Sequence, residues 1–215
     1  TACGACVWEC FAKALERVGR DVTVDEALAD VLRDRPFYET SGGGMTLSGG
    51  EPLQQIAFTA ALLARAKAEG LHCAVETCLV CDYARLERIR GHVDLFLCDW
   101  KETDPEQHEA RTGAGNERIR ENLLRPDAEG AAIRLRCPIL PGLNDRPDHF
   151  AGIADLCGRL RHLAGVEVMA YHRLGESKRE RLGLPPSPCD SIDTPSDADV
   201  AAWKRSLASL GVPLI

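Results

Sequence analysis

A glycine-rich segment that ends in a carboxylate is the first stretch of this chain that could do chemistry. The sequence Ser-Gly-Gly-Glu-Pro at 48–52 follows a short apolar run. Glycine has no Cβ, so Gly49 and Gly50 let the backbone approach a ligand closely, and Glu51 then lies at the rim of a sheet. Such a turn suits a small cationic or zwitterionic ligand. The alternative is an ordinary strand-to-helix turn with Pro52 at the first helical position.

Three cysteines near the start of the chain have the spacing of metal ligands. Cys3, Cys6 and Cys10 form the pattern C-x2-C-x3-C. The bacterial ferredoxin run is C-x2-C-x2-C-x3-C, and on that template the first cysteine would fall one residue before Thr1. We therefore expect this sequence to be the carboxyl-terminal portion of a longer protein. Structural zinc is the competing interpretation of such spacing.

Length and composition exclude several classes of protein. The 215 residues carry a formal net charge of -7 and ten cysteines. They suffice for one large domain, or one domain with a small appendage. No basic block suggests a nucleic-acid partner, and no apolar run approaches the roughly 18 residues of a membrane helix. Apolar content and long helical patterns favour a reduced, cytoplasmic enzyme over a disulfide scaffold.

The order of apolar and turn residues predicts an α/β fold. A capping box at Thr23 and Glu26 opens a helix that runs to about residue 33. Strands are predicted over 45–48, 72–76, 94–98, 132–136 and 166–170, with helices over 54–69, 146–163 and 196–210 and an extended tail at 212–215. Strands that alternate with helices pair in parallel, which favours a barrel or partial barrel.

Polar residues follow each predicted strand. They are Gly49 to Glu51, Glu76 with Thr77, Asp99 with Lys101, Arg136, and Tyr171 with His172. In a parallel barrel all strand carboxyl ends lie at one face, where active sites are built. Each has a simpler explanation: Lys101 could be solvated, Arg136 could pair with a glutamate of a neighbouring helix, and His172 could lie at the surface. Their shared position favours a common site.

Four segments together resemble a known family. They are residues 34–52, Thr112-Gly113, Pro-Gly-Leu-Asn-Asp at 141–145, and Tyr-His-Arg-Leu-Gly-Glu-Ser-Lys at 171–178. The chain resembles the activating enzymes of glycyl radical enzymes, such as pyruvate formate-lyase-activating enzyme, within the radical S-adenosylmethionine superfamily. The match runs from Cys3 to about Gly183.

The resemblance implies a domain organisation. Residues 21–215 would form a partial (β/α)6 radical S-adenosylmethionine barrel that lacks its first strand. Residues 1–20 would be the end of a ferredoxin-like insert, in which Cys3, Cys6 and Cys10 bind an auxiliary 4Fe-4S cluster. The family's C-x3-C-x2-C loop, which binds the catalytic 4Fe-4S cluster, would lie before Thr1. We therefore expect the chain as given to be inactive on its own.

The resemblance also assigns roles to individual residues. Gly49, Gly50 and Glu51 would receive the amino group of S-adenosylmethionine, and Lys101 would lie near its carboxylate. The other implied contacts are Arg136 beside the cofactor as a second catalytic residue, His172 on the ribose or adenine side, Trp100 within the Asp-x-Lys motif, and Glu76, Thr77 and Asp99 near a monovalent cation.

The activity implied by the resemblance is radical formation. Reductive cleavage of S-adenosylmethionine would give a 5'-deoxyadenosyl radical, which takes hydrogen from a glycine Cα of a large glycyl radical enzyme. A flavodoxin or ferredoxin would donate the electron. Two alternatives remain open: a radical enzyme of the same superfamily that acts on a small molecule, and a ferredoxin-like electron carrier fused to a non-catalytic barrel.

Some residues depart from the family pattern. Leu79 stands where a glycine is usual, and Trp100 stands where an aliphatic residue is usual. Cys73, Cys78 and Cys81 have a spacing, C-x4-C-x2-C, that differs from the catalytic loop, and we interpret them as core or loop residues in preference to a metal site. The remaining cysteines are interpreted as core residues at Cys98, Cys137 and Cys157 and as an exposed residue at Cys189.

Overall fold

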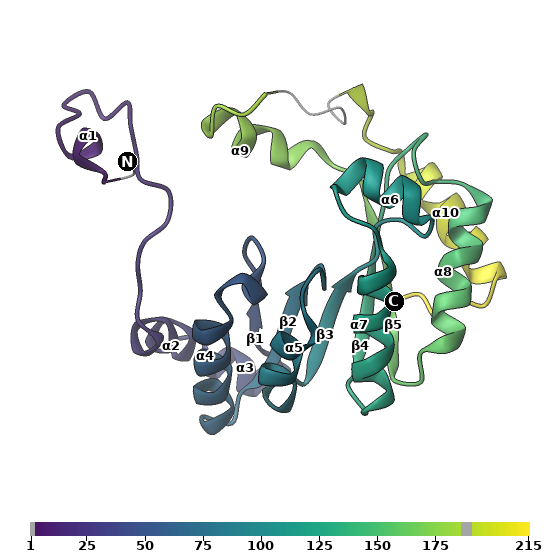
Figure 1. Ribbon diagram of the computed structural model, residues 1–215, viewed down its shortest axis with the longest axis horizontal. Helices are drawn as coiled ribbons and strands as arrows, with labels where there is room; N and C mark the ends of the chain where they lie inside the picture. The colour runs from purple at the N-terminus through teal and green to yellow at the C-terminus, as the bar shows by residue number, and fades with distance from the viewer. Residues whose placement is uncertain (1–2, 186–190) are drawn as a thin grey trace.

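Five parallel strands form the centre of the molecule. The computed structural model describes residues 3–185 and 191–215 (Figure 1). The strands are β1 (Gly44–Leu47), β2 (His72–Thr77), β3 (Leu95–Asp99), β4 (Ile133–Ile139) and β5 (Leu163–Ala170). Their order in the sheet is β1-β2-β3-β4-β5, and every neighbouring pair is parallel. The α/β class and the five predicted strands are confirmed.

Helices connect successive strands on one side of the sheet. The main ones are α4 (Ile56–Ala68), α5 (Tyr83–Ile89), α7 (Glu117–Ala128) and α8 (Pro147–Arg159), all seen on the same side of the sheet in Figure 1. Shorter helices occur at η1 (Pro52–Gln55), η2 (Arg90–His92) and α6 (Pro105–Thr112). This arrangement follows from parallel pairing, because each strand needs a crossover to return to the same edge.

The remaining helices precede β1 or follow β5. They are α1 (Ala5–Trp8), α2 (Val24–Leu32), α3 (Arg35–Ser41), η3 (Arg173–Gly175), α9 (Glu176–Arg181) and α10 (Asp197–Ser209). Helix α2 begins with the predicted capping box: Thr23 and Glu26 each bond the other's backbone N–H. In Figure 1, the segment that contains α1 stands apart from the sheet. An ion pair between Glu16 and Arg181 joins this segment to α9.

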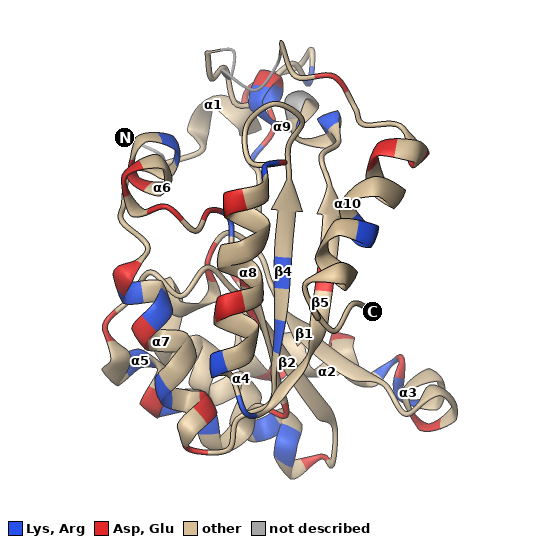
Figure 2. Ribbon diagram, turned by 90° about the vertical axis from the view of Figure 1, so that its right-hand side faces the viewer, with Lys and Arg blue, Asp and Glu red and all other residues tan. Residues whose placement is uncertain are grey.

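The two faces of the sheet differ in chemistry. On β4, Ile133, Leu135, Cys137 and Ile139 are at most 1% exposed, whereas the residues between them, including Arg134 and Arg136, are half-buried. The buried set belongs to the core beneath the helices. The other face carries charge, as the coloured bands on β4 and β5 in Figure 2 show. Alternation along a strand thus separates the core from a polar inner face.

The structure corrects one predicted boundary. A single helix was expected over 146–163, but α8 ends at Arg159 and β5 already begins at Leu163. Leu160 is extended, with φ -90° and ψ 129°. The reason is tertiary: the buried Asp127 carboxylate accepts the backbone N–H groups of Arg161 and His162, at 2.9 and 2.7 Å. These bonds hold a tight connection that apolar periodicity does not reveal.

The chain's cysteines and its tail agree with most expectations. Cys98 and Cys137 are buried in strands, and Cys157 packs half-buried against the core. The tail pairs with the sheet through a parallel bridge from Leu214 to Val166. Cys189 lies outside the described residues. The proposed division at residue 20 stays a prediction.

Removal of the Asp127 carboxylate should destabilise the fold. Asp127→Ala leaves two backbone N–H groups without an acceptor, and we expect the free energy of unfolding to fall by about 2 to 4 kcal/mol. Urea denaturation measures this change. Asp155→Ala, an exposed aspartate on α8, is the matched control and should change stability by less than about 0.5 kcal/mol. Equal effects of the two substitutions would contradict this account of the α8–β5 connection.

Candidate functional site

Residues at and after the carboxyl ends of β1, β2 and β3 converge on one small cavity. It measures about 120 Å³ and is lined by Ser48, Gly49, Gly50, Glu51, Glu76, Thr77, Cys78, Asp99 and Lys101. Most of the residues predicted to share a site therefore do share one. The cause is the parallel sheet, which brings the carboxyl ends of its strands to a single edge.

Three hydrogen bonds hold the carboxylate of Glu51. Its Oε1 accepts from the backbone N–H of Leu53 at 3.1 Å and from the Thr77 hydroxyl at 2.8 Å. Its Oε2 accepts from the backbone N–H of Cys78 at 2.9 Å. A carboxylate offers about four acceptor positions, so Oε2 keeps capacity for a ligand. Glu51 is thus a fixed anion at the rim of the cavity.

A row of alternating charges crosses the inner face beside Glu51. Lys101 Nζ lies 3.4 Å from Asp99, and the Arg136 guanidinium lies 3.9 Å from Asp99 and 3.5 Å from Glu167. Arg136 also pairs with Glu76. Burial raises the pKa of Asp99, although Lys101 and Arg136 oppose that shift. The simpler explanation for Arg136, a pairing with a glutamate of a neighbouring helix, does not hold, because the carboxylates that it contacts come from β2, β3 and β5.

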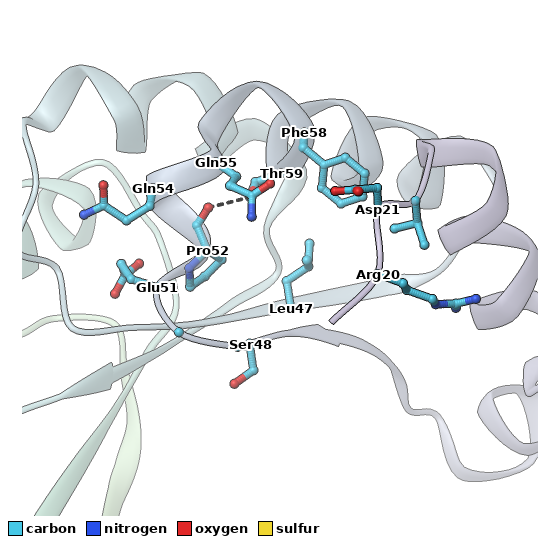
Figure 3. A pocket seen from close by; sticks show the side chains of 13 residues that line it. Arg20, Asp21, Leu47, Ser48, Glu51, Pro52, Gln54, Gln55, Phe58 and Thr59 are labelled. Carbon is cyan, nitrogen blue, oxygen red and sulfur yellow. Dashed lines mark hydrogen bonds between the residues drawn. The ribbon is translucent and has the colours of Figure 1, made fainter. Parts of the chain in front are cut away.

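A larger hollow adjoins the small cavity on the β1 side (Figure 3). It measures about 510 Å³ and lies between residues 20–22, the 47–52 turn and the first part of α4. Phe58 and Leu47 give it an apolar wall, and the Thr59 hydroxyl donates to the Pro52 carbonyl at 2.7 Å. Residues 48–51 line both hollows. Space that could hold a ligand is therefore present on both sides of the glycine-rich turn.

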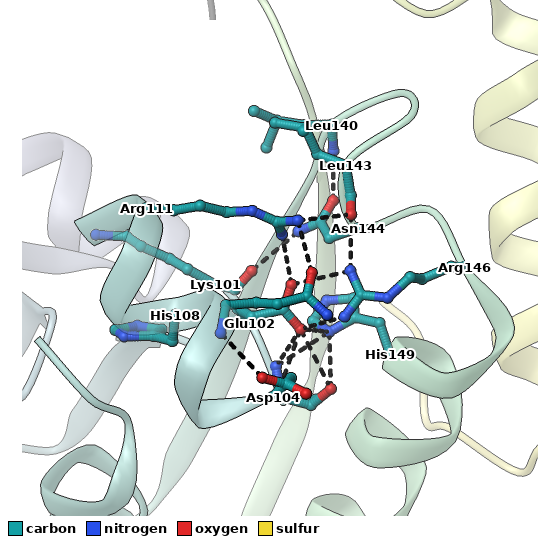
Figure 4. A network of polar contacts seen from close by, with 12 residues as sticks. Lys101, Glu102, Asp104, His108, Arg111, Leu140, Leu143, Asn144, Arg146 and His149 are labelled. Carbon is teal, nitrogen blue, oxygen red and sulfur yellow. Dashed lines mark hydrogen bonds and ion pairs between the residues drawn. The ribbon is translucent and has the colours of Figure 1, made fainter. Parts of the chain in front are cut away.

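A buried polar network holds the segment after β3 (Figure 4). Glu102 is 2% exposed, and its carboxylate accepts from Arg111 at 2.6 Å and from Arg146 at 2.8 Å. The Asn144 amide donates to the carbonyls of Lys101 and Pro138, at 2.9 and 2.8 Å. These contacts tie the end of β3 to the end of β4. They fix the backbone from which Lys101 extends.

The same network contains a neutral histidine. His149 is fully buried, and burial lowers its pKa to about 4. The backbone N–H of Thr103 points to its Nδ1 at 3.2 Å, which suits an unprotonated nitrogen. Burial alone would raise the pKa of Glu102, but hydrogen bonds from Arg146 and from the Asp104 N–H lower it below its usual range. Glu102 is therefore the charged partner of the two arginines.

Two predicted cofactor contacts lie apart from the cavity. The Trp100 side chain is 1% exposed and belongs to the core, so only its backbone could face a ligand. His172 is exposed after β5 and does not line either hollow. The Arg136 side chain does not line the cavity itself, but it pairs with Glu76 and Asp99, which do.

The predicted metal ligands are not gathered. Among the described residues, no three His, Cys, Asp or Glu side chains cluster closely enough to hold a metal ion. Cys3 and Cys6 are exposed, and the Cys10 sulfur accepts from the Ala14 N–H at 3.2 Å. The structure does not bring these three thiols together, and their assignment as cluster ligands rests on their spacing alone. Within the described part of the chain, no group of three metal-binding side chains is found around Glu76 and Asp99 either, where a cation was predicted. Both carboxylates contact the Arg136 guanidinium instead.

Comparison with known families identifies the fold. The model of the radical SAM superfamily matches residues 5–157, most of the chain. The chain belongs to the radical SAM superfamily. The five parallel strands are therefore a radical SAM-like partial barrel, and the small cavity lies where the strands of that barrel end.

Sequence relatives narrow the superfamily to one group. An isethionate sulfite-lyase activating enzyme of Nitratidesulfovibrio vulgaris is 41% identical over 175 residues, which cover 80% of this chain and 56% of the relative. The pyruvate formate-lyase-activating enzyme of Clostridium pasteurianum is 34% identical over 166 residues, with 77% and 69% covered. These are activating enzymes of glycyl radical enzymes, so the predicted family is confirmed.

Solved structures agree with the sequence relatives. A domain of a pyruvate formate-lyase-activating enzyme from Bacteroides vulgatus is 25% identical with a TM-score of 0.66, and the match covers 80% of this chain and 98% of that domain. The chain is shorter than several relatives, and it spans 55% of a (2S)-3-sulfopropanediol dehydratase activating enzyme from Klebsiella oxytoca. In the described part of the chain, no helix combines the length and apolar character needed to span a membrane.

Several residues of the site were missed by sequence reasoning. Cys78 lines the cavity, and the network of Glu102, Arg111, Arg146 and His149 supports it. Asn144 lies in the 141–145 segment that carried the resemblance, so a signal existed for it. Glu102 follows Lys101 directly, but nothing in the local sequence indicates that it is buried.

The buried His149 predicts a pH-dependent stability. Its folded pKa of about 4 lies below the ordinary value of 6.5, so the unfolded chain binds a proton that the folded chain does not. Stability is full above pH 6.5 and falls as the pH decreases toward 4, by at most about 3 kcal/mol. Urea denaturation across this range measures the slope.

Substitution identifies the group responsible. His149→Gln should flatten the slope between pH 6.5 and 4, whereas His72→Gln, at an exposed position, should leave it unchanged. An unchanged slope in His149→Gln would show that another group titrates.

Proposed function

We propose that this protein activates a glycyl radical enzyme by reductive cleavage of S-adenosylmethionine. The proposal is supported by relatives that are activating enzymes, at 36% identity over 207 residues for the choline trimethylamine-lyase activating enzyme of Oleidesulfovibrio alaskensis and 35% over 215 residues for the indoleacetate decarboxylase activating enzyme of Tractidigestivibacter scatoligenes. The relatives' names cover several lyases, a decarboxylase and a dehydratase. The proposal therefore names the class of the partner, a large glycyl radical enzyme.

The observation that carries the proposal is the pairing of opposite charges in one cavity. Glu51 and Lys101 both line it, on the turn after β1 and the segment after β3. S-adenosylmethionine carries an ammonium, a carboxylate and a sulfonium, so it needs an anion and a cation held at fixed positions. Glu51 would bind the ammonium, and Lys101 would bind the carboxylate. Gly49, with φ 135°, keeps the turn open to the ligand.

The other charged residues would orient the ligand. Arg136 is held by three carboxylates, so its guanidinium stays beside the cavity with little freedom to rotate. The fixed carboxylate of Glu51 lowers the entropy lost on binding. Glu51, Lys101 and Arg136 would hold S-adenosylmethionine, which, when bound, would supply the radical chemistry needed to remove hydrogen from a glycine Cα. The protein's part is to hold the cofactor in position.

The other components follow from the sequence. We assign an auxiliary 4Fe-4S cluster to Cys3, Cys6 and Cys10 from their spacing, and a flavodoxin or ferredoxin as the electron donor. A monovalent cation near Glu76, Thr77 and Asp99 and a contact from His172 to the ribose or adenine side belong to the same proposal. We propose a cytoplasmic protein, because the apolar content and long helical patterns of the sequence favour an enzyme with reduced cysteines over a disulfide scaffold.

Neutralising either charge in the cavity should weaken cofactor binding. Glu51→Gln removes the anion that faces the ammonium, and Lys101→Met removes the cation that faces the carboxylate. Loss of a charged hydrogen-bond partner costs roughly 1.5 to 3 kcal/mol, so each dissociation constant should rise by about one to two decades. Equilibrium dialysis with the cluster-reconstituted protein measures the affinity.

Matched surface variants control for nonspecific effects. Glu87→Gln and Lys204→Met change the same residue types at exposed positions away from the cavity and should leave the affinity within a factor of two. Unchanged binding in both Glu51→Gln and Lys101→Met would overturn the assignment of this cavity to S-adenosylmethionine.

Radical transfer tests the activity itself. The protein with its catalytic-cluster loop, reconstituted, reduced and mixed with S-adenosylmethionine and a candidate glycyl radical enzyme, should produce a glycyl radical in that enzyme, detected by electron paramagnetic resonance. A variant of the partner with alanine at the radical glycine is the control and should give no signal. Cleavage of S-adenosylmethionine without a partner radical would instead favour a small-molecule substrate.

A further inference from the structure

The turn between β2 and α5 has an unusual backbone. Leu79 adopts a φ of +59°, in the left-handed region that favours glycine. For a residue with a Cβ this conformation costs about 1 to 2 kcal/mol. The Leu79 side chain is 1% exposed, so the core anchors it in place. A strained backbone persists only where surrounding contacts hold it.

A buried amide on α7 makes those contacts. The Asn122 Nδ2 group donates to the carbonyls of Leu79 and Cys81, both at 2.9 Å, and the residue is 4% exposed. Within the turn, the Leu79 N–H donates to the Thr77 hydroxyl oxygen at 3.0 Å. The Cys81 N–H also donates to the Leu79 carbonyl at 2.9 Å. From outside the turn, the Asn122 side chain thus satisfies the carbonyls of Leu79 and Cys81.

The turn in its left-handed form supplies two of the three donors on Glu51. They are the Thr77 hydroxyl and the Cys78 N–H, on opposite oxygens of the carboxylate. If residues 77–81 relaxed to an ordinary backbone conformation, the Cys78 N–H would turn away from Oε2. The orientation of Glu51 therefore depends on the turn, and the turn depends on Asn122.

We propose that Asn122 is a positioning residue for the cofactor-binding carboxylate. It lies outside the residues that line the cavity and acts through the 77–81 turn on Glu51. The inference rests on the proposed function, because it takes the ligand of Glu51 to be the ammonium of S-adenosylmethionine.

A double-mutant cycle separates positioning from a general loss of stability. Asn122→Leu keeps the volume and removes both hydrogen bonds. With Glu51 intact it should raise the dissociation constant of S-adenosylmethionine about five- to tenfold. In a Glu51→Gln background the same substitution should change the constant less than twofold, since the positioned charge is already gone.

The chain offers a matched control on the same helix. Asn116, at the amino-terminal cap of α7, is fully buried, and its Nδ2 donates to the carbonyls of Glu102 and Thr103, at 2.9 and 3.0 Å. Asn116→Leu removes equivalent bonds from a segment that does not touch Glu51. Its effect on affinity should be the same in both backgrounds. Circular dichroism confirms that each variant is folded under the binding conditions.

Substitutions of Leu79 test the turn if Asn122→Leu does not fold. Glycine adopts a φ of +59° without cost, so Leu79→Gly should keep the affinity within twofold although the protein loses stability. A β-branched residue is a severe outlier in this region, so Leu79→Val should weaken binding at least fivefold with Glu51 intact. Hydrogen exchange at the Cys78 amide, without cofactor, should be faster in Asn122→Leu and Leu79→Val than in Asn116→Leu.

The outcomes distinguish the inference from the function on which it rests. If Glu51→Gln weakens binding but the Asn122 effect is equal in both backgrounds, Asn122 has only a structural role and the inference is overturned. If Glu51→Gln leaves binding unchanged, the proposed cofactor site fails and the inference fails with it. The positioning role is supported if the effect of Asn122→Leu on affinity disappears in the Glu51→Gln background while the effect of Asn116→Leu is the same in both backgrounds.

Discussion

Parallel register is the constraint on which the rest of this structure depends. It sets Asp99 opposite Arg136 and Arg136 opposite Glu167, so that charges on three successive strands meet on one face. The adjacent residues along each strand, such as Leu135 and Cys98, point to the other face of the sheet and therefore lie in the core. A shift of any strand by one residue would exchange these two sets. The charged row and the hydrophobic core are thus two results of one pairing pattern.

The site is built in two layers that differ in exposure. Glu51 and Lys101 face the cavity, whereas the groups that hold the segment of Lys101 are buried: Glu102 at 2% exposure and Asn144 at 3%. Buried polar groups are costly unless every donor and acceptor is satisfied. Here the charged Glu102 satisfies two arginines and two backbone N–H groups. Rigidity at the cavity is therefore supplied by polar contacts to a carboxylate that is itself buried.

Sequence reasoning recovered the strands and the residues at their ends, because alternating apolar runs and punctuating glycines are local signals. It did not recover the supporting network. Glu102 and Arg111 lie on different elements from His149, which is far away in the chain, and each has the sequence context of an ordinary surface residue. Trp100 shows what its position within Asp-x-Lys does not reveal: its side chain lies on the core side, which leaves only its backbone to face a ligand. Side-chain direction after a strand ends is a tertiary property.

Helix α7 has a consequence for how this chain can vary. Near its middle, Asn122 reaches the turn at the carboxyl edge of the sheet, and one and a half turns later Asp127 reaches the connection at the opposite edge. A residue inserted between them would rotate one anchor against the other by about 100°. Insertions and deletions should therefore be excluded from the stretch between Asn122 and Asp127, whereas its exposed positions are free to change residue type.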